Sequence, residues 1–273
     1  MNAFAARSGD WALVTGAGRG IGRFLCRHFA AKGMRIAAVD IDEAAARETI
    51  DLCPTEGRAL PCDVSDHDSV LAAATELSDA NIAPSLVWLN AGVGSATTVL
   101  DAKPHALDWL LGVNVYGPIR TAQAFVPLMP ESGPRHVGIT ASSASVTPVS
   151  GPYTLYATTK QMTAAIGEAL MAELAPKGVG VTILCPGILD TDIWNAAQAR
   201  PERFGGARQT PGEVGDHWRA QPGPDVLARG LDEALAAGGG WCIVPTETDT
   251  EGKMADRHDA QSAGLKRYAV KQP

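Results

Sequence analysis

The stretch WALVTGAGRGIG, residues 11–22, decides the fold of this 273-residue chain. An apolar run over residues 11–16 leads into a turn with glycines at positions 16, 18, 20 and 22, and a helix-like pattern follows over residues 20–32. Glycine lets the backbone turn sharply and approach a ligand closely, while the first turn of a helix offers free N–H groups and a partial positive charge. This order of strand, glycine-rich turn and helix predicts a dinucleotide-binding crossover.

Short apolar runs and helix-like stretches alternate along the rest of the chain. The runs predict strands over residues 34–40, 58–60, 85–92, 135–143, 180–187 and 241–245. The stretches between them predict helices over residues 42–53, 66–79, 104–129, 153–176 and 224–237. Several runs are apolar nearly throughout, which is typical of strands buried on both faces. We therefore expect a single α/β domain over residues 1–273, with a doubly wound, Rossmann-type, seven-stranded parallel sheet and helices on both faces.

Composition and charge exclude several function classes. Hydrophobic residues make up 45% of the chain and charged residues 19%, so a sizeable core can form. The net charge of −7 and the lack of a basic stripe argue against a nucleic-acid partner. No apolar run approaches the roughly 20 residues of a membrane span, and the N-terminus does not resemble a signal peptide, so we expect no membrane partner and a cytoplasmic location. The five cysteines form no CxxC pair and the six histidines no HxH or HExxH, so no metal site is expected.

An acidic residue follows the glycine turn at the spacing that favours NAD. Asp40 ends the second predicted strand, 20 residues after Gly20. A carboxylate in this position holds the ribose hydroxyls of NAD and repels the 2′-phosphate of NADP. Arg19, inside the turn, is either a solvated loop residue or a group that attracts that phosphate. The sequence favours NAD as cofactor and leaves NADP possible.

A second group of polar residues lies near the ends of the later predicted strands. Tyr156 and Lys160 are one helical turn apart, and Ser143 lies 13 residues before Tyr156. Ser142 competes with Ser143, but this spacing favours Ser143, and Asn114 lies in the preceding predicted helix. The carboxyl ends of parallel strands meet at one edge of a sheet, where α/β folds bind ligands. We therefore expect these residues to lie beside the glycine turn.

The Tyr156–Lys160 pair predicts acid/base chemistry. A free phenol has a pKa of about 10 and is mostly protonated at neutral pH. A neighbouring ammonium, together with a positive nicotinamide ring, favours the phenolate and lowers that pKa. We expect Tyr156 to exchange a proton with an alcohol or ketone oxygen, to which Ser143 donates a hydrogen bond.

As a set, these motifs resemble the short-chain dehydrogenase/reductase family from about Trp11 to Thr191: TGAGRGIG (15–22), DV (63–64), NAG (90–92), the Ser–Tyr–Lys spacing and PGILDT (186–191). The resemblance implies a catalytic set of Asn114, Ser143, Tyr156 and Lys160, in which Asn114 holds a water linking Lys160 to solvent. It implies the following cofactor contacts: Gly16, Gly18, Arg19, Gly20, Ile21, Gly22, Asp40, Ile41, Asp63, Val64, Asn90, Ala91, Gly92, Tyr156, Lys160, Pro186, Gly187, Ile188 and Thr191.

The activity that this resemblance implies is hydride transfer between a nicotinamide and a secondary alcohol or ketone. One alternative is an NADP-dependent carbonyl reductase acting on an acyl chain, a steroid or a sugar alcohol. Another is an NAD-binding redox sensor without turnover. An epimerase or dehydratase of the extended branch is a third, but such enzymes have a larger C-terminal domain, and only about 80 residues follow Thr191.

The substrate side is predicted from the segment over residues 190–224, which we expect to form a lid. Over residues 192–219 it carries four arginines and four acidic residues, so the charge balance predicts a neutral, moderately apolar alcohol or ketone. Trp194, Phe204 and Trp218 are candidate apolar contacts. The candidate substrate-binding residues are Gly94, Ser145, Tyr153 and Trp194.

The C-terminal part departs from the family pattern. Many members of the family have a D-G-G turn after the seventh strand and a short tail that packs across a tetramer axis. This chain has GGGWCIVPTETDTEGK over residues 238–253, and a polar tail over residues 246–273. We expect a homodimer or a modified homotetramer, with the tail covering a neighbour, closing the site or remaining disordered.

Overall fold

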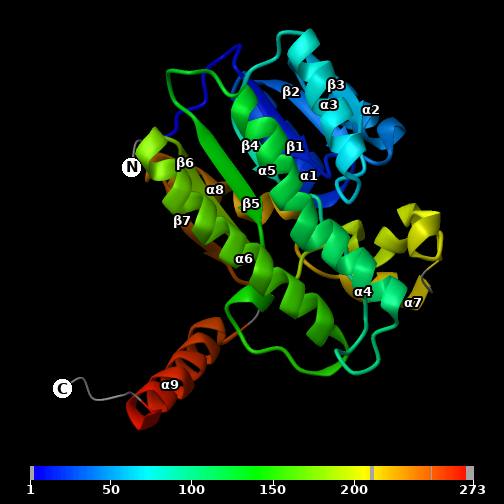
Figure 1. Cartoon of the computed structure of the whole chain (residues 1–273), viewed down its shortest axis with the longest axis vertical. Coiled ribbons are helices and arrows are strands. Elements are labelled where there is room, and N and C mark those ends of the chain that lie inside the picture. Colours follow the sequence, from blue (N-terminus) through cyan, green and yellow to red (C-terminus); the bar gives the residue numbers. More distant parts are fainter. Residues whose placement is uncertain (1–2, 210–211, 247, 269–273) are drawn as a thin grey trace.

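A parallel sheet of seven strands forms the centre of the molecule, with strand order β3-β2-β1-β4-β5-β6-β7 (Figure 1). The computed structural model describes residues 3–209, 212–246 and 248–268. The strands are β1 (Trp11–Thr15), β2 (Arg35–Asp40), β3 (Gly57–Pro61), β4 (Pro84–Leu89), β5 (His136–Thr140), β6 (Gly180–Pro186) and β7 (Gly239–Val244). Each neighbouring pair is parallel. The predicted fold class is confirmed.

Helices cover both faces of the sheet, as predicted. They are α1 (Gly20–Ala31), α2 (Glu43–Asp51), α3 (His67–Asp79), α4 (Pro104–Leu111), α5 (Gly117–Phe125), α6 (Thr154–Leu174), α7 (Gly212–Arg219), α8 (Ala228–Ala236) and α9 (Thr250–Tyr268). One buried core joins the sheet to α3, α4, α5 and α6. A second core joins the other face to α1, α2 and α8. The carboxyl ends of the strands form the edge of the sheet that lies between these two layers of helices.

Short 3-10 helical turns join several of these elements. They are Val126–Leu128, Ser143–Ser145, Gly151–Tyr153, Ala175–Lys177, Asp192–Ala199, Glu202–Phe204 and Pro224–Leu227. Three elements thus lie in the segment over residues 190–224, which carried no clear sequence pattern: two 3-10 turns and α7. Propensity says little about such short turns, because they depend on packing against the rest of the protein.

The glycine turn needs its glycines for two different reasons. Gly16 has a φ of +64°, a conformation that side chains with a Cβ rarely adopt. Gly22 has no such φ, but a Cβ built on it would lie 1.8 Å from the carbonyl oxygen of Gly16. α1 can therefore pack directly against the turn only because position 22 is glycine.

The predicted helix over residues 104–129 is interrupted. α4 and α5 are separated by a π-helical turn, Gly112–Tyr116. Pro118 has no N–H to donate to the carbonyl four residues earlier, which is that of Asn114. The hydroxyl of Thr163 in α6 donates to that carbonyl instead, at 2.8 Å. The interruption places Asn114 at an irregular turn, a feature that is frequent at functional sites.

The polar tail forms a helix in its described part. α9 extends away from the body of the molecule (Figure 1, red). Within α9, the Arg257 guanidinium donates to the carbonyl oxygen of Ser145 at 3.0 Å. Across the described ranges, no helix has both the length and the apolar character needed to cross a bilayer.

Candidate active site

One cavity of about 890 Å³ opens at the carboxyl edge of the sheet. Its wall includes the following predicted cofactor contacts: Gly16, Arg19, Gly20, Ile21, Gly22, Asp40, Ile41, Asp63, Val64, Asn90, Ala91, Gly92, Tyr156, Lys160, Pro186, Gly187, Ile188 and Thr191. Gly18 does not line the wall. Its N–H donates to the Asp40 carboxylate at 2.8 Å, so Gly18 orients a wall residue from behind.

Asp40 presents an oriented carboxylate to this cavity. One oxygen accepts the N–H of Gly18 at 2.8 Å and the other accepts the N–H of Asp42 at 2.9 Å. Burial raises the pKa of Asp40, and these two backbone donors partly offset that rise. Each carboxylate oxygen keeps further acceptor capacity, so the group can also accept hydrogen bonds from a diol.

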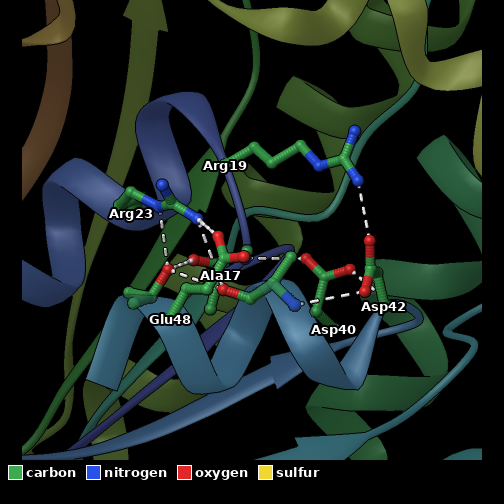
Figure 2. A network of polar contacts seen from close by, with 9 residues as sticks. Ala17, Arg19, Arg23, Asp40, Asp42 and Glu48 are labelled. Carbon is green, nitrogen blue, oxygen red and sulfur yellow. Dashed lines mark hydrogen bonds and ion pairs between the residues drawn. The ribbon is translucent and has the colours of Figure 1, made fainter. Parts of the chain in front are cut away.

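Arg19 is engaged by a carboxylate. Its guanidinium donates to Asp42 at 2.7 Å, and Figure 2 shows this contact beside Asp40. Asp42 also caps α2 by accepting the N–H of Ala45 at 3.1 Å. A 2′-phosphate at this position would have to compete with a formed ion pair.

The N-terminus of α1 is suited to a phosphate group. Arg19 stands at the N-cap but makes no side-chain capping bond there, so the side chain leaves the first-turn N–H groups to another acceptor. Gly20 has a φ of +47°, and a Cβ on it would lie 3.0 Å from the Cβ of Thr191. These groups fit the diphosphate of a dinucleotide, which helix N-termini bind through their N–H groups and dipole.

Asn90 ties the end of β4 to the glycine turn. Its side-chain amide donates to the carbonyls of Thr15 at 3.0 Å and Gly16 at 3.2 Å. Its oxygen accepts the Thr140 hydroxyl at 3.0 Å. Asn90 thus holds three strand ends in place and lines the cavity at the same time.

Lys160 is buried at the centre of the site. It is 2% exposed, and its Nζ donates to the carbonyl oxygen of Thr140 at 2.9 Å. A Cβ on Gly92 would come within 3.0 Å of that Nζ, so glycine makes room for the ammonium. Burial lowers the pKa of Lys160 to about 8.

Two features of its surroundings act most strongly on the pKa of Tyr156: the loss of water around the phenol and the Ser142 hydroxyl. Burial raises the pKa of Tyr156 to about 12, and the hydrogen bond with the Ser142 side chain opposes that rise. In the protein alone the loss of water around the phenol outweighs this hydrogen bond. The lowering of the phenol pKa by Lys160 together with a positive nicotinamide ring stays a prediction.

The three serines after β5 have different surroundings. Ser142 and Ser143 both line the cavity. The Ser142 hydroxyl accepts the N–H of Ala144 at 3.2 Å and lies at Tyr156. Ser145 does not line the cavity, because its hydroxyl donates to the carbonyl of Lys160 at 2.7 Å. The expectation that Ser145 contacts the substrate is therefore not supported by its position.

Asn114 lies behind the wall and is fully buried. Its side-chain oxygen accepts the N–H of Val93 at 2.8 Å, and its amide donates to the Val93 carbonyl at 2.9 Å. The same amide donates to the Thr159 hydroxyl at 3.0 Å. These bonds use both amide protons, so the side chain fixes the loop after β4 to α6.

Most of the predicted substrate contacts lie on the cavity wall. Gly94, Tyr153, Trp194 and Trp218 line it, as predicted, whereas Phe204 does not. A Cβ on Gly112 would lie 3.3 Å from the Phe204 ring, so this ring packs against the π-helical turn. The wall also includes residues that were not singled out from the sequence: Ile193, Asn195, Arg200, Arg208, His217 and Lys253. No motif marks them, because they reach the cavity only through the fold of the lid and α9.

A salt bridge joins the lid to the end of β3. The Arg203 guanidinium lies 2.7 Å from the Asp63 carboxylate and donates to the Ser65 hydroxyl at 2.8 Å. Asp63 also accepts the N–H of Ser65 at 2.9 Å. The carboxylate that the family resemblance assigns to the adenine is thus engaged by a lid residue. Among the residues described, no group of acidic, histidine and cysteine side chains could hold a metal ion.

Fold and site together define a dinucleotide-binding α/β protein in which a half-buried tyrosine and a buried lysine line one cavity. Residues 10–202 match the family model described as short chain dehydrogenase, and the chain belongs to the short-chain dehydrogenase/reductase family. It is an oxidoreductase family whose members use NAD or NADP.

Similar proteins agree with this assignment. The chain is 34% identical over 232 residues to a probable oxidoreductase, EphD, of Mycobacterium tuberculosis, covering 81% of this chain and only 38% of that protein. It is 33% identical over 200 residues to galactitol 2-dehydrogenase (L-tagatose-forming) of Cereibacter sphaeroides, covering 72% of this chain and 78% of the relative. Its fold is similar to that of a short chain dehydrogenase/reductase from Burkholderia phymatum in complex with NAD, with a TM-score of 0.84, 26% identity and coverage of 98% and 99%.

Proposed function

We propose that the protein is an NAD-dependent oxidoreductase that interconverts a secondary alcohol and a ketone, with Tyr156 as general acid/base. The position of Tyr156 carries this proposal. It lines the same cavity as the glycine turn and Asp40, and Lys160 lines the cavity one helical turn further along α6. A phenol, an ammonium and a nucleotide-shaped site in one cavity are the groups that this reaction needs.

The preference for NAD rests on Asp40 and Arg19. The Asp40 carboxylate lines the cavity in a fixed orientation, which favours ribose hydroxyls over a 2′-phosphate. The salt bridge of Arg19 with Asp42 removes the cation that NADP would use. The Burkholderia phymatum relative in complex with NAD is consistent with this preference. NADP-dependent carbonyl reduction is the alternative, and a lower KM for NADPH than for NADH would favour it.

Three side chains have separate roles in the proton transfer. Tyr156 takes a proton from an alcohol oxygen, or returns one to a ketone oxygen. Ser143 donates a hydrogen bond to that oxygen and stabilises the charge that develops on it. Lys160, held by the Thr140 carbonyl, supplies a positive charge beside the phenolate when its amine is protonated. Bound NAD supplies the hydride-accepting chemistry.

A secondary-alcohol substrate is supported by the galactitol 2-dehydrogenase relative, whose substrate is a polyol. An NAD-binding redox sensor is less well supported. A sensor has no use for Ser143, Tyr156 and Lys160 lining one cavity, whereas an oxidoreductase needs all three.

The test is Tyr156→Phe, assayed by NADH absorbance with a panel of secondary alcohols and ketones. General acid/base catalysis contributes roughly 10²- to 10⁴-fold, so kcat should fall by at least about a hundredfold. NADH binding, followed by fluorescence titration, should stay within about twofold. Tyr116→Phe is the control, because Tyr116 is 51% exposed and does not line the cavity. Near-normal kcat in Tyr156→Phe would contradict the assigned role.

A further inference from the structure

Arg200 is a buried cation of the cavity wall that forms no salt bridge with the residues the structure describes. It is 7% exposed, and its Cζ lies 4.9 Å from the ring centroid of Trp109 in α4. Its Nε and Nη2 are buried and have no hydrogen-bond partner among the residues that the structure describes. A buried donor left unpaired is costly, and more so when it is charged, so such a group points to an acceptor that comes from outside the chain.

The four arginines of the lid fall into two groups, those that form a salt bridge and those that form none with the described residues. Arg203 pairs with Asp63 at 2.7 Å and Arg219 pairs with Asp216 at 2.8 Å. Within the described part of the chain, Arg200 and Arg208 make no salt bridge, and both line the cavity. Among the acidic lid residues only Asp192 is found on the described wall, so Arg200 and Arg208 leave the lid part of the wall with a net positive charge.

Arg208 stands close to Arg200. The N–H of Arg208 donates to the carbonyl of Ala197 at 2.9 Å, which returns the chain toward the turn that carries Arg200. Burial lowers the pKa of Arg200, and the charge of Arg208 lowers it further, so the two guanidinium groups repel each other. An arginine nevertheless keeps its proton in proteins. Two such groups on the wall of one cavity favour a ligand that carries negative charge.

We propose that Arg200, assisted by Arg208, binds an oxyanion of the substrate, so that the substrate carries a carboxylate or phosphate besides its alcohol or ketone group. This inference rests on the oxidoreductase function proposed above, and it replaces the neutral substrate that the charge count predicted. The guanidinium fork matches two oxygens of such a group with parallel N–H donors. The Trp109 ring holds the fork in place without using its donors.

The dinucleotide diphosphate is a less suitable partner for Arg200. The donors for that group lie at the N-terminus of α1, and α1 packs in the core on one face of the sheet. Trp109, on which Arg200 rests, belongs to the core on the opposite face. The two sets of donors thus approach the cavity from different sides.

The experiment compares keto acids with their methyl esters as substrates, since each pair differs only in the charge of the acid group. We measure kcat/KM by NADH absorbance in the wild type, Arg200→Met and Arg200→Lys. Methionine keeps much of the apolar stem and removes the charge, and lysine keeps the charge without the fork. The acid-to-ester ratio should fall at least tenfold in Arg200→Met and partly recover in Arg200→Lys. Arg229→Met in α8 is the control, because its side chain is 90% exposed and pairs with Glu233.

A binding measurement and a folding control complete the test. The Kd for NADH should be the same in Arg200→Met and the wild type. A tenfold weaker Kd with an unchanged acid-to-ester ratio would assign Arg200 to the cofactor and overturn the proposal. An unchanged ratio together with an unchanged Kd would overturn it as well. Far-UV circular dichroism and the melting temperature confirm that the variants are folded.

Failure of the oxidoreductase function can be told apart from failure of the anion site. If the wild type turns over no member of the panel, the function above is wrong for these compounds, and the anion site is then tested by binding alone. Benzoate should raise the melting temperature of the NADH-saturated wild type more than benzamide does, and this difference should vanish in Arg200→Met. Equal effects of benzoate and benzamide on the wild type would overturn the anion site.

Discussion

At the residue scale, burial moves the pKa values of Tyr156 and Lys160 away from each other. The pKa of Tyr156 rises to about 12 and that of Lys160 falls to about 8, because each group loses the water that stabilises its charged form. The phenol of Tyr156 is therefore neutral at pH 7, whereas a pKa of about 8 leaves the Lys160 amine mostly protonated at that pH. A negative charge on the phenol has to be stabilised by what binds in the cavity.

The lowered pKa of Lys160 predicts a pH-dependent stability. Between its folded pKa of about 8 and its ordinary value of 10.5, the unfolded chain binds a proton that the folded chain does not. The contribution of Lys160 to the free energy of unfolding should therefore rise by about 2 kcal/mol between about pH 7.5 and pH 9.5. Burial raises the pKa values of the thiols of Cys26, Cys53, Cys62, Cys185 and Cys242, and these groups lower the free energy of unfolding in the upper part of the same window, in the wild type and the variants alike. In urea unfolding, the difference between the wild type and Lys160→Met should therefore rise with pH, whereas the difference between the wild type and Lys103→Met, at an exposed position, should stay constant. Parallel curves for the wild type and Lys160→Met would contradict the assignment.

Ser142 and Ser143 should give different kinetic signatures. The Ser142 hydroxyl hydrogen-bonds to Tyr156 and lowers its pKa, so Ser142→Ala should move the pH profile of kcat to higher pH. Ser143→Ala should instead lower kcat by about a hundredfold or more at every pH, because it removes a donor to the substrate oxygen. Steady-state kinetics over a pH range distinguish the two. Identical profiles for the two variants would mean that one role has been assigned to the wrong serine.

At the element scale, the cofactor end depends on direct contact between α1 and the glycine turn. Thr49 in α2 donates to the carbonyl of Ala17 at 2.9 Å, and Arg23 in α1 donates to the Thr49 hydroxyl at 3.0 Å. These bonds fix the turn from both neighbouring helices. The turn can present its N–H groups to a phosphate because its own carbonyls are held by the protein.

Gly22→Ala tests this packing. The new Cβ would lie 1.8 Å from the Gly16 carbonyl oxygen, so either α1 or the turn must move. We expect a loss of about 3 kcal/mol or more in the free energy of unfolding, together with weaker NADH binding. Gly223→Ala is the matched control, since its Cβ meets nothing nearer than 3.9 Å and its φ is −68°. A wild-type midpoint in urea for Gly22→Ala would contradict the packing argument.

At the scale of the whole molecule, the cavity is assembled from parts far apart in the chain. The sheet edge supplies the glycine turn, Tyr156 and Lys160, the lid supplies Arg200 and Arg208, and α9 supplies Lys253. The lid is joined to β3 by Arg203, and α9 is joined to the site by Arg257. The described residues of α9 otherwise leave most of the helix exposed.

Deleting residues 249–273 tests the role of this helix. Because α9 projects from the body, the deletion should change the free energy of unfolding by no more than about 1 kcal/mol. Loss of Lys253 from the cavity wall should raise the KM of an anionic substrate. Light scattering should give a homodimer or homotetramer for the full chain, as expected from the family resemblance, and a monomeric mass would contradict that expectation. The full chain with Lys253→Met separates the loss of one charge from the loss of the helix.

The elements that the sequence predicted well are those whose signals are local. The strands and α1, α2, α3 and α6 follow their predicted ranges, because buried strands and amphipathic helices repeat their pattern over a few residues. The break between α4 and α5 was missed. Pro118 is a visible signal for it, but the acceptor it frees is satisfied by Thr163, which lies far along the chain.

The parallel α/β sheet, the glycine turn with Asp40 and the spacing of Tyr156 and Lys160 could be predicted from the sequence, because each has its signal within one strand or helix or at the end of one. The pairing of charges could not be predicted and is known from the fold. The lid contains equal numbers of arginines and acidic residues, yet Arg203 pairs with Asp63 while Arg200 is buried on Trp109 and pairs with no carboxylate of the described residues. An electrostatic interaction depends on the distance between charges and on the water between them, and neither can be counted along a chain.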